Sequence, residues 1–320
     1  MQLRQHIDTT PLCVELDGTV LRTTVLLEGV LALLRENPLI LFLLPVWLWR
    51  GQAYFKDEVA RRAQIDPAGL PYNSELLTRL REERAAERPI ELVTGANHRA
   101  ANAIADHLGI FDRVTASTAD RCLDGKARRD ALIARYGEGG FDYAGDAHDD
   151  LPVWRAARHA ILVSPAPGVA SRAPKVANVR EVVGAPAFPM AEFFRALRPH
   201  QWTKNLLVFA PMILAHRFDE ALAWFLTSLT FLAFSLCASA IYLLNDLLDA
   251  PADSRHLTKR FRPIAAGKLD RRLALAAVPA LLAAGISLAA VVSWQLAGIL
   301  LAYLAATVLY SLTLKRKMLW

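Results

Sequence analysis

The chain has few cysteines and no histidine pair of the kind that many metal enzymes use. Its 320 residues include three cysteines, Cys13, Cys122 and Cys237, which are far apart and form no CxxC or Cys/His spacing. An odd number of separated thiols argues against a disulfide framework and is typical of a reducing compartment. The eight histidines are scattered without an HExxH pattern, so the sequence also argues against a zinc site.

Charged residues are also scarce. They make up 21% of the chain, against about a quarter in an average soluble protein, and 54% of the residues are hydrophobic. The net charge is +6, and the basic residues beyond Asp253 lie beside long apolar segments. This arrangement favours a membrane lipid surface as the partner and predicts no nucleic-acid partner. Residues 1–20 contain no long apolar run, so no signal peptide is predicted.

Residues 1–185 alternate between short strand-like runs and helical patterns. The β-type runs lie at 11–16, 89–95, 140–146 and 159–164, and helical patterns lie between them, for example at 97–108 and 124–136. This alternation predicts an α/β domain with a parallel sheet, helices on both faces and a site at the carboxyl ends of the strands. A Pro-, Ala- and Gly-rich stretch at 164–189 is interpreted as strand ends and linker, with the domain boundary near Pro189.

An insertion at 23–52 is nearly all apolar. Its longest apolar run, Pro38–Trp49, has 12 residues, whereas a membrane span needs about 20. Two interpretations follow. The insertion is either a buried helical hairpin or a cap that lies on the membrane interface, with Trp47 and Trp49 at headgroup depth.

From residue 190 onwards the composition is that of a membrane domain. Uncharged runs cover Trp224–Leu244, Leu273–Val292 and Leu296–Leu314, each long enough for a transmembrane helix, and Asn205–Ala215 is a shorter candidate. Basic residues gather in the loop at 251–272 and after the last run. The positive-inside rule places both on the cytoplasmic side. The sequence therefore predicts about four helices in a multi-pass protein of an inner or plasma membrane, with the α/β domain in the cytoplasm.

Four motifs in the α/β region follow one another in a recognisable order. They are "ELDGTV" from residue 15, "LVTG" ending at residue 95, "DGKARRDAL" from residue 124 and "YAGDAHDD" ending at residue 150. Together they resemble the motifs of the haloacid dehalogenase (HAD) superfamily of phosphohydrolases, and the resemblance covers about residues 10–170. It implies a HAD-like fold, a Rossmannoid parallel sheet, for the domain at 1–185.

The resemblance also implies a role for each motif residue. A carboxylate at the first position attacks phosphorus and forms an acyl-phosphate, and a second carboxylate two residues on acts as the acid/base. Hydroxyl and amine groups neutralise phosphoryl oxygens, and two further carboxylates bind Mg²⁺ through oxygen. The corresponding residues here are Glu15 and Asp17 for catalysis, Thr94 and Lys126 for phosphate binding, and Asp146 and Asp150 for the metal.

Glu15 departs from the family pattern, in which the nucleophile is an aspartate. One added methylene moves the attacking oxygen by about 1 Å, and a misplacement of that size can cost on the order of 100-fold in rate. Glu15 could still ligate Mg²⁺. Two alternatives stay open, a membrane-tethered HAD-type phosphatase and a degenerate phosphate-binding or scaffolding domain.

A second aspartate set follows the first long apolar run. Asp246, Asp249 and Asp253 are spaced by three and four residues, so on a helix they share one face. Pro251 disfavours helical backbone at Ala250, so Asp253 lies either on the helix or on the following loop. Three carboxylates this close repel one another unless a divalent cation lies between them. Oxygen ligands suit Mg²⁺, which also prefers substrate phosphates.

Basic residues after this acidic cluster can grip phosphate oxygens, namely Lys259, Arg260 and Arg262. The alternative is an ordinary charged loop that contacts lipid headgroups. That alternative does not explain Asn245 and Asp246 within the apolar end of the helix, where acidic groups usually serve a function.

The stretch "NDLLDAPAD" resembles the NDxxDxxxD motif of the UbiA superfamily of intramembrane prenyltransferases, and "RALRPHQWTKN" and "TKRFRPIAAG" are similar to the same family. The resemblance covers 193–320. It implies an all-α helical bundle that binds a polyprenyl diphosphate through Mg²⁺. The residues carried over are Asn245, Asp246, Asp249 and Asp253 as the Asp-rich motif, with Asp246 and Asp249 as catalytic residues, and Arg198, Lys204, Lys259, Arg260 and Arg262 as diphosphate contacts.

The sequences of these motifs look most like those of the branch that moves phosphoribose from phosphoribosyl diphosphate onto a polyprenyl phosphate. Bundles of this family have about twice as many helices and a second Asp-rich motif. The domain at 190–320 is therefore expected to be a partial bundle that pairs with a second chain. The predicted function is Mg²⁺-dependent transfer of a prenyl or phosphoribosyl group, with the tethered phosphatase or a non-catalytic membrane scaffold as alternatives.

Overall fold

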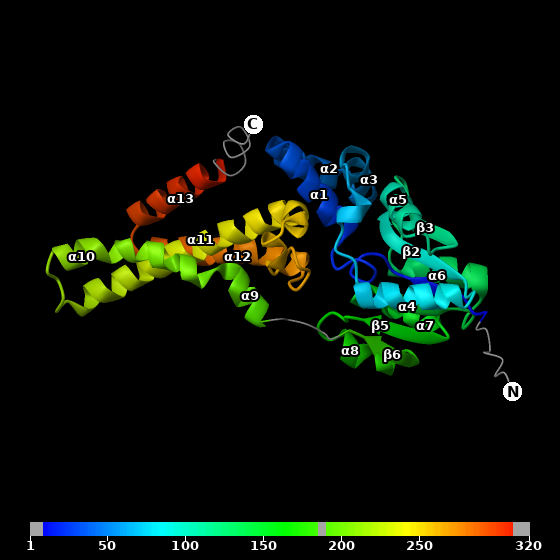
Figure 1. Cartoon of the computed structure of the whole chain (residues 1–320). Coiled ribbons are helices and arrows are strands. Elements are labelled where there is room, and N and C mark those ends of the chain that lie inside the picture. Colours follow the sequence, from blue (N-terminus) through cyan, green and yellow to red (C-terminus); the bar gives the residue numbers. More distant parts are fainter. Residues whose placement is uncertain (1–8, 185–189, 310–320) are drawn as a thin grey trace. The chain divides into compact units, whose positions relative to one another are not determined.

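The computed structural model describes residues 9–184 and 190–309, and the chain forms two compact units, Met1–Ala187 and Phe188–Trp320 (Figure 1). Six strands lie in the first unit, and the described elements of the second unit are all helical. The predicted order, an α/β region followed by a helical region, is confirmed. The predicted boundary residue, Pro189, lies outside the described residues.

A six-stranded sheet forms the centre of the α/β unit. Its strands are β1 (Leu12–Val14), β2 (Ile90–Asn97), β3 (Arg113–Ser117), β4 (Asp142–Gly145), β5 (His159–Val163) and β6 (Val179–Val183). They are ordered β3-β2-β1-β4-β5-β6, and every neighbouring pair is parallel, as predicted. The order changes direction at β1. The carboxyl ends of β1, β2 and β4 therefore meet at the switch point, where α/β sheets bind their ligands.

The sequence predicts four of these strands and misses β3 and β6, which form the two edges of the sheet. Residues along β6 alternate between partly buried and exposed, because an edge strand has only one neighbour to pack beside. It therefore lacks the continuous apolar run that identified β5. Since β6 lies within 164–189, the interpretation of that whole stretch as strand ends and linker is wrong for Val179–Val183.

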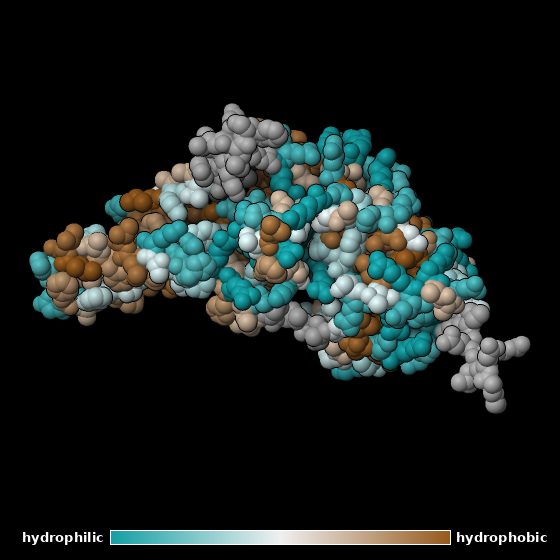
Figure 2. All heavy atoms as spheres, viewed as in Figure 1, coloured by the Kyte–Doolittle hydropathy of each residue, from teal (hydrophilic) through white to brown (hydrophobic). Residues whose placement is uncertain are grey.

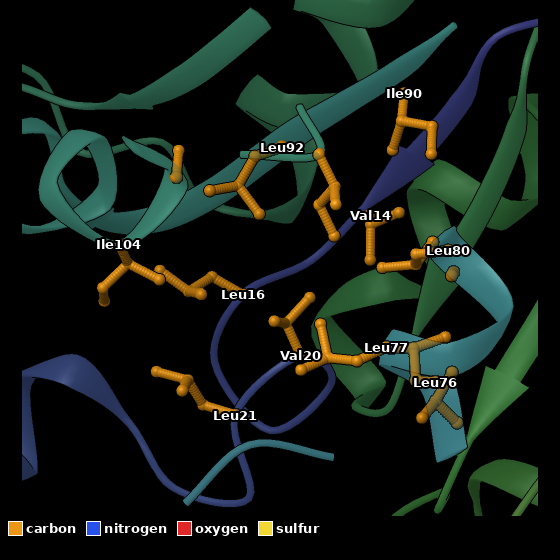
Figure 3. Close-up of a cluster of buried hydrophobic side chains, with 14 of the residues drawn as sticks. Val14, Leu16, Val20, Leu21, Leu76, Leu77, Leu80, Ile90, Leu92 and Ile104 are labelled. Carbon is orange, nitrogen blue, oxygen red and sulfur yellow. The ribbon is translucent and has the colours of Figure 1, made fainter. Parts of the chain in front are cut away.

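Helices cover both faces of the sheet because successive side chains of a strand point to opposite sides. Val14 packs in a cluster with Leu80 and Ile104 on one face (Figure 3). Cys13, the residue before it, packs with Trp154 on the other face. The helices that supply these two clusters are α4 (Ser74–Ala85) and α5 (His98–Leu108) on the first face, and α6 (Gly125–Tyr136) and α7 (Leu151–Ala156) on the second.

The apolar insertion forms a small helical cap between β1 and α4. Trp47 is buried against Leu33 and Val59, as expected for a helical hairpin, whereas Trp49 is 90% exposed. One face of the insertion is therefore packed, and the other is open. The elements of the cap are α1 (Val25–Glu36), η1 (Pro38–Phe42), α2 (Leu44–Trp49) and α3 (Gln52–Arg62).

Two helices of the second unit, α11 and α12, are long and apolar enough to cross a membrane. Figure 2 shows hydrophobic residues gathered over α10 and the adjoining part of α11. The elements of this unit are α9 (Met190–Leu197), η5 (Pro199–Phe209), α10 (Ala210–Leu214), α11 (Ala221–Arg255), η6 (Lys259–Phe261), α12 (Arg271–Val292) and α13 (Trp294–Leu309).

The expectation of four spans is not met within the described residues. The segment at 205–215 is not one α-helix, because it is divided between η5 and the five residues of α10. Part of the predicted last span forms α13, and its residues 310–314 lie outside the described residues. Length and hydropathy therefore identified the two central helices correctly and did not detect that the first segment is irregular.

Helices α11 and α12 pack closely side by side (Figure 1). Gly285 of α12 faces Ala233 and Cys237 of α11, and a Cβ at Gly285 would lie 2.9 Å from the carbonyl oxygen of Ala233. Only glycine fits there without moving one helix. Small residues of this kind allow helix backbones to approach each other in membranes, where dispersion contacts replace the hydrophobic effect.

Helix α11 continues through Pro251 to Arg255, which settles the position of Asp253 on the helix. Proline lacks the N–H that would continue the backbone hydrogen bonds, so a local rule predicts an end near this point. Two side-chain contacts stabilise the last turn of the helix instead. Ser254 Oγ donates to the Pro251 carbonyl at 2.9 Å, and Arg262 binds the Asp253 carboxylate at 2.6 Å. The three aspartates of this segment therefore lie on one continuous helix.

Candidate functional site

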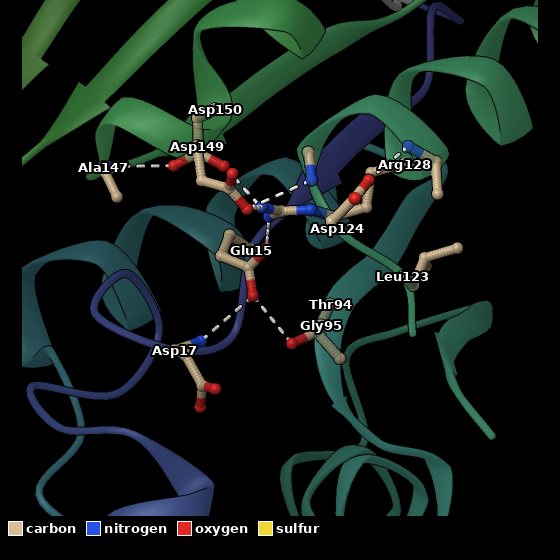
Figure 4. A network of polar contacts seen from close by, with 12 residues as sticks. Glu15, Asp17, Thr94, Gly95, Leu123, Asp124, Arg128, Ala147, Asp149 and Asp150 are labelled. Atoms are coloured by element: carbon tan, nitrogen blue, oxygen red, sulfur yellow. Dashed lines mark hydrogen bonds and ion pairs between the residues drawn. The ribbon is translucent and has the colours of Figure 1, made fainter. Parts of the chain in front are cut away.

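The predicted site of the α/β unit lies at the switch point of the sheet. Glu15 follows β1 directly, and Thr94 lies near the end of β2. Both are buried. Thr94 Oγ1 donates to Glu15 Oε1 at 2.7 Å, and the backbone N–H of Asp17 donates to the same oxygen at 3.3 Å (Figure 4). The structure thus brings Glu15 and Thr94 together, as the motifs predicted.

Arg128, which the sequence interpretation did not select, occupies the centre of this site. Its guanidinium forms an ion pair with Glu15 and lies 3.0 Å from carboxylate oxygens of Asp149 and Asp150 (Figure 4). Burial lowers the pKa of Arg128, but Tyr143, Asp150 and Asp149 raise it by more, so it lies above its ordinary value. Arg128 is therefore a permanent buried cation next to the residue at the nucleophile position.

Lys126, the residue predicted to bind phosphate, is exposed. The buried face of α6 carries Gly125, Arg128 and Leu132, so the helix turns Arg128 inward and Lys126 outward. The spacing of Arg128 four residues before Leu132 is the signal that could have identified it.

The other motif carboxylates also have structural partners. Asp17 Oδ1 accepts the N–H of Val25 at 2.8 Å, at the first turn of α1, and Figure 4 shows its carboxylate directed away from that of Glu15. Asp150 Oδ2 accepts the N–H groups of Asp146 and Ala147 at 3.0 and 2.9 Å. In this arrangement Asp17 is not placed to exchange a proton at Glu15.

Mg²⁺ does not fit the α/β site in this arrangement. Asp150 is occupied on one oxygen by Arg128 and Tyr143 and on the other by backbone N–H groups. Asp146 Oδ1 accepts the hydroxyl of Thr19 at 3.1 Å. Among the residues that the structure describes, no group of three His, Cys, Asp or Glu side chains is positioned to hold a metal. Arg128 supplies the positive charge that a metal would otherwise provide.

This geometry gives a prediction for Glu15→Asp. The sequence alone suggests that the shorter side chain would restore phosphatase activity. The structure leads us to expect no gain, less than twofold, because Arg128 still pairs with the carboxylate and Asp17 is still turned away. Hydrolysis of a small phosphate ester by the intact protein measures this, with Asp124→Asn, at an exposed helix cap, as the control. A tenfold gain for Glu15→Asp would show that the ion pair opens readily.

A second site lies at the end of α11. Asp246, which is buried, accepts two hydrogen bonds from Arg198 Nη2, at 2.6 and 2.9 Å. Arg262 Nη1 lies 3.1 Å from Asp246 Oδ1 and 2.6 Å from Asp253 Oδ2, so one nitrogen joins two buried carboxylates. Arg198 also lies over the ring of Tyr242, 5.4 Å from its centroid. Arg198 and Arg262, which are 48 and 16 positions from Asp246 in the sequence, thus meet at this helix.

The remaining predicted residues of this site are half-buried or exposed. Asn245 and Asp249 are half-buried on the same helix. Lys204 and Lys259 are exposed, and Arg260 is exposed beside the ring of Phe261, 4.9 Å from its centroid. The structure therefore brings together two of the three aspartates and two of the five predicted basic residues.

The donor set of this second site suits Mg²⁺ in its chemistry. It consists of carboxylate oxygens, which magnesium prefers, and two of them already converge on one positively charged nitrogen. The guanidinium of Arg262 lies between the carboxylates of Asp246 and Asp253, where a cation would bind. Asp246 and Asp253 would hold the metal, and Arg262 is the group that would have to leave.

Two serines of α11 anchor the segment that carries Arg198. Trp202 Nε1 donates to Ser239 Oγ, and Asn205 Nδ2 donates to Ser235 Oγ, both at 3.0 Å. Ser239 Oγ in turn donates to the Leu197 carbonyl at 2.8 Å. The sequence interpretation missed these serines, because a single hydroxyl within a long apolar helix carries no distinct pattern. They fix the chain on both sides of Arg198.

The chain thus joins an α/β unit to two helices of membrane length, with paired arginines and aspartates at the end of the first. Residues 206–320 match the family model described as the UbiA prenyltransferase family. This part of the chain is a UbiA-family domain, and the predicted resemblance is confirmed.

Proteins from several bacteria are similar to the chain. An uncharacterized protein, y4nM, from Sinorhizobium fredii is 37% identical over 308 residues, covering 96% of this chain and 59% of that protein. A decaprenyl-phosphate phosphoribosyltransferase from Mycobacterium tuberculosis is 39% identical over 140 residues, covering 42% of this chain and 46% of that protein. The first alignment spans both units. The chain spans less than two thirds of the length of either relative.

Solved structures resemble the α/β unit. A phosphoserine phosphatase determined with its substrate aligns with a TM-score of 0.39 at 14% identity, covering 55% of this chain and 93% of that one.

Proposed function

We propose that the protein is a membrane transferase that uses a diphosphate donor. It moves either a phosphoribosyl group onto a polyprenyl phosphate or a prenyl group from a prenyl diphosphate onto an acceptor. The observation that carries the proposal is the pairing of Arg198 and Arg262 with Asp246 and Asp253. Guanidinium groups are strong, directional ligands for phosphate oxygens. A diphosphate that reaches this site competes for the two arginines and leaves the carboxylates available for a cation.

Different residues of the site have different roles in this proposal. Arg198 and Arg262 bind and orient the phosphate oxygens, and exposed Lys259 and Arg260 add positive charge close by in the sequence. Asn245, one residue before Asp246, is available to hydrogen-bond the donor, and Lys204 belongs to the same basic set. Bound Mg²⁺, held by the three aspartates, would neutralise the diphosphate leaving group and so stabilise a cation-like carbon. Because Mg²⁺ would replace Arg262, the negative charge of the buried carboxylates is balanced both with and without bound donor.

The donor we favour is phosphoribosyl diphosphate, with a polyprenyl phosphate as the acceptor. The M. tuberculosis relative carries this type of activity in its name. A prenyl diphosphate as donor is the second choice. Because the chain spans about half of that relative, we propose that further helices, in a second chain or beyond these residues, complete the enclosure of the lipid.

We also propose a multi-pass arrangement with the α/β unit in the cytoplasm. Basic residues of the 256–270 connection and of the chain end favour that side. Within the α/β unit, the ion pair between Glu15 and Arg128 supports a scaffolding or phosphate-sensing role over hydrolysis.

The test is metal-dependent stabilisation by each donor. Phosphoribosyl diphosphate and a soluble short-chain prenyl diphosphate are added to the full chain in detergent, with Mg²⁺ or with a chelator. Ligand binding should raise the unfolding midpoint only with Mg²⁺, because stabilisation follows saturation. Asp246→Asn should weaken binding by at least tenfold. The donor with the larger shift is the favoured one.

Two variants serve as controls. Asp270→Asn alters an aspartate of the same unit that caps α12 through Arg272 N at 2.7 Å, a bond that asparagine retains. Asp146→Asn alters only the α/β site. Neither should change the shift. An equal shift in chelator, or its loss through Asp146→Asn alone, would place the diphosphate elsewhere and overturn the proposal.

A further inference from the structure

The cap of the α/β unit exposes a group of large apolar side chains from one segment. Among the described residues of that unit, eight large hydrophobic side chains are exposed, and seven of them belong to the segment at 39–49. The eighth, Val182, is isolated on edge strand β6. Single exposed apolar residues are ordinary, whereas a group confined to one segment marks a binding surface. The seven are Leu39, Leu41, Phe42, Leu43, Val46, Leu48 and Trp49, and we refer to them as the cap surface.

The cap surface is held in place from beneath. Trp47 lies in the same segment but is buried with Leu33 and Val59, and the guanidinium of Arg62 lies 4.8 Å from the centroid of its indole. Asn37 begins the segment by accepting the N–H of Leu39 at 3.0 Å. The packed side of the segment thus anchors it to the cap. The exposed side chains are presented by folded helices and not by an unstructured loop.

The chemistry of the segment points to lipid. Pro38–Trp49 contains no charge over 12 residues, which is too short to span a bilayer and sufficient to lie along its surface. The two outermost side chains are aromatic, Phe42 at 74% and Trp49 at 90% exposure. Arg50 follows at once, and its Nη1 bonds the hydroxyl of Tyr54 at 3.0 Å. Tryptophan, tyrosine and arginine beside an aliphatic surface are the residues found at membrane interfaces.

The same chain also brings this unit to a membrane. Strand β6 ends at Val183, and helix α9 of the membrane-integral unit begins at Met190. This short connection keeps the α/β unit at a high local concentration beside the bilayer, so even a weak affinity is sufficient for binding. We propose that the cap surface inserts into the interfacial layer of the bilayer and seats the α/β unit on the membrane.

The test uses the full chain in liposomes of phosphatidylcholine and phosphatidylglycerol. In a Cys122→Ser background the two remaining cysteines are buried, so Leu48→Cys can be labelled selectively with a fluorophore that bromine and iodide quench. Lipids brominated in their acyl chains should quench the Leu48→Cys label at least threefold more than a label at Arg81→Cys, an exposed position on α4. Aqueous iodide should show the opposite preference.

A second substitution asks whether the apolar surface is the cause. Adding Phe42→Asp should move the Leu48→Cys label into reach of iodide and abolish its quenching by brominated lipid, whereas Val182→Asp, at another exposed apolar residue, should change neither. Iodide access equal to that of Arg81→Cys in the parent would overturn the proposal. Protection of the label that survives Phe42→Asp, or efficient cross-linking of Leu48→Cys between two copies, would assign the surface to protein and overturn it as well.

Discussion

Replacing Arg262 with alanine is expected to make the stability of the helical unit depend on magnesium. Without Arg262, Asp253 loses the partner that joins it to Asp246, and Asp246 keeps only Arg198. Breaking a buried pair by removing one partner typically costs 3–5 kcal/mol, and we expect about 3 kcal/mol here because Arg198 remains. A divalent cation can replace the lost positive charge between the carboxylates. The unfolding midpoint should therefore fall by about 6–12 °C in chelator and largely recover in millimolar Mg²⁺.

Cys237 provides a readout for this unit alone. It is fully buried where α11 packs on α12, so its reaction with a thiol dye on heating reports the separation of these helices. Cys13→Ala and Cys122→Ser remove the other thiols. Arg217→Ala is the control, because its partner Glu220 is exposed and the pair adds little. If Arg262→Ala were equally unstable with and without Mg²⁺, these carboxylates would not be a metal site.

Replacing Asp142 with alanine should destabilise the α/β unit by about 3–5 kcal/mol. Asp142 is fully buried, and Arg158 donates to both its oxygens, at 2.9 and 2.7 Å. Arg88, which is also buried, forms a second ion pair with it, and His159 lies 3.1 Å away. Alanine would remove one carboxylate partner of the buried Arg88 guanidinium, which also pairs with Glu83. The reaction of buried Cys13 with a thiol dye measures this unfolding, and exposed Asp130→Ala should shift it by less than about 0.5 kcal/mol.

The pH dependence gives a second check on Asp142. Burial raises its pKa, but hydrogen bonds from Arg158 and Arg88 lower it by more, so the folded-state pKa lies below its ordinary value. A carboxylate with a lowered folded pKa stabilises the protein above its unfolded pKa of about 3.9 and loses this contribution as the pH falls towards the folded value. The wild type should therefore lose stability below about pH 4, and Asp142→Ala should lose less there. Parallel acid curves for the two proteins would contradict the assignment.

The parts of this fold that were predictable are those with strong local patterns. Strands β1, β2, β4 and β5 are buried, so their apolar runs identify them, and the long uncharged runs identify α11 and α12. Edge strands β3 and β6 contain polar or charged residues among their apolar ones and lack a continuous apolar run. The irregular segment at 199–209 was not predictable, because its form depends on contacts of Trp202 and Asn205 with α11.

The sites show the same division between local pattern and tertiary contact. Glu15 and Thr94 were located because a motif fixes their places at strand ends. Arg128 was missed because its role depends on which face of α6 is buried, and the motif drew attention to Lys126 instead. The position of Asp253 was left open because Pro251 is a local helix breaker, whereas the bond to Arg262 is tertiary.

The length of α11 determines how deep in the membrane its carboxylates lie. A helix of 35 residues is about 52 Å long, whereas the hydrocarbon layer is about 30 Å thick. With Ala221 at one edge of that layer, Asp246 lies about 38 Å along the axis, beyond the opposite edge and among the lipid headgroups. In the proposed reaction, a lipid phosphate would reach this level while its tail stays in the hydrocarbon, and a water-soluble sugar diphosphate would arrive from the aqueous phase. A helix of this length would therefore let the two proposed reactants, which differ in solubility, meet at the same depth.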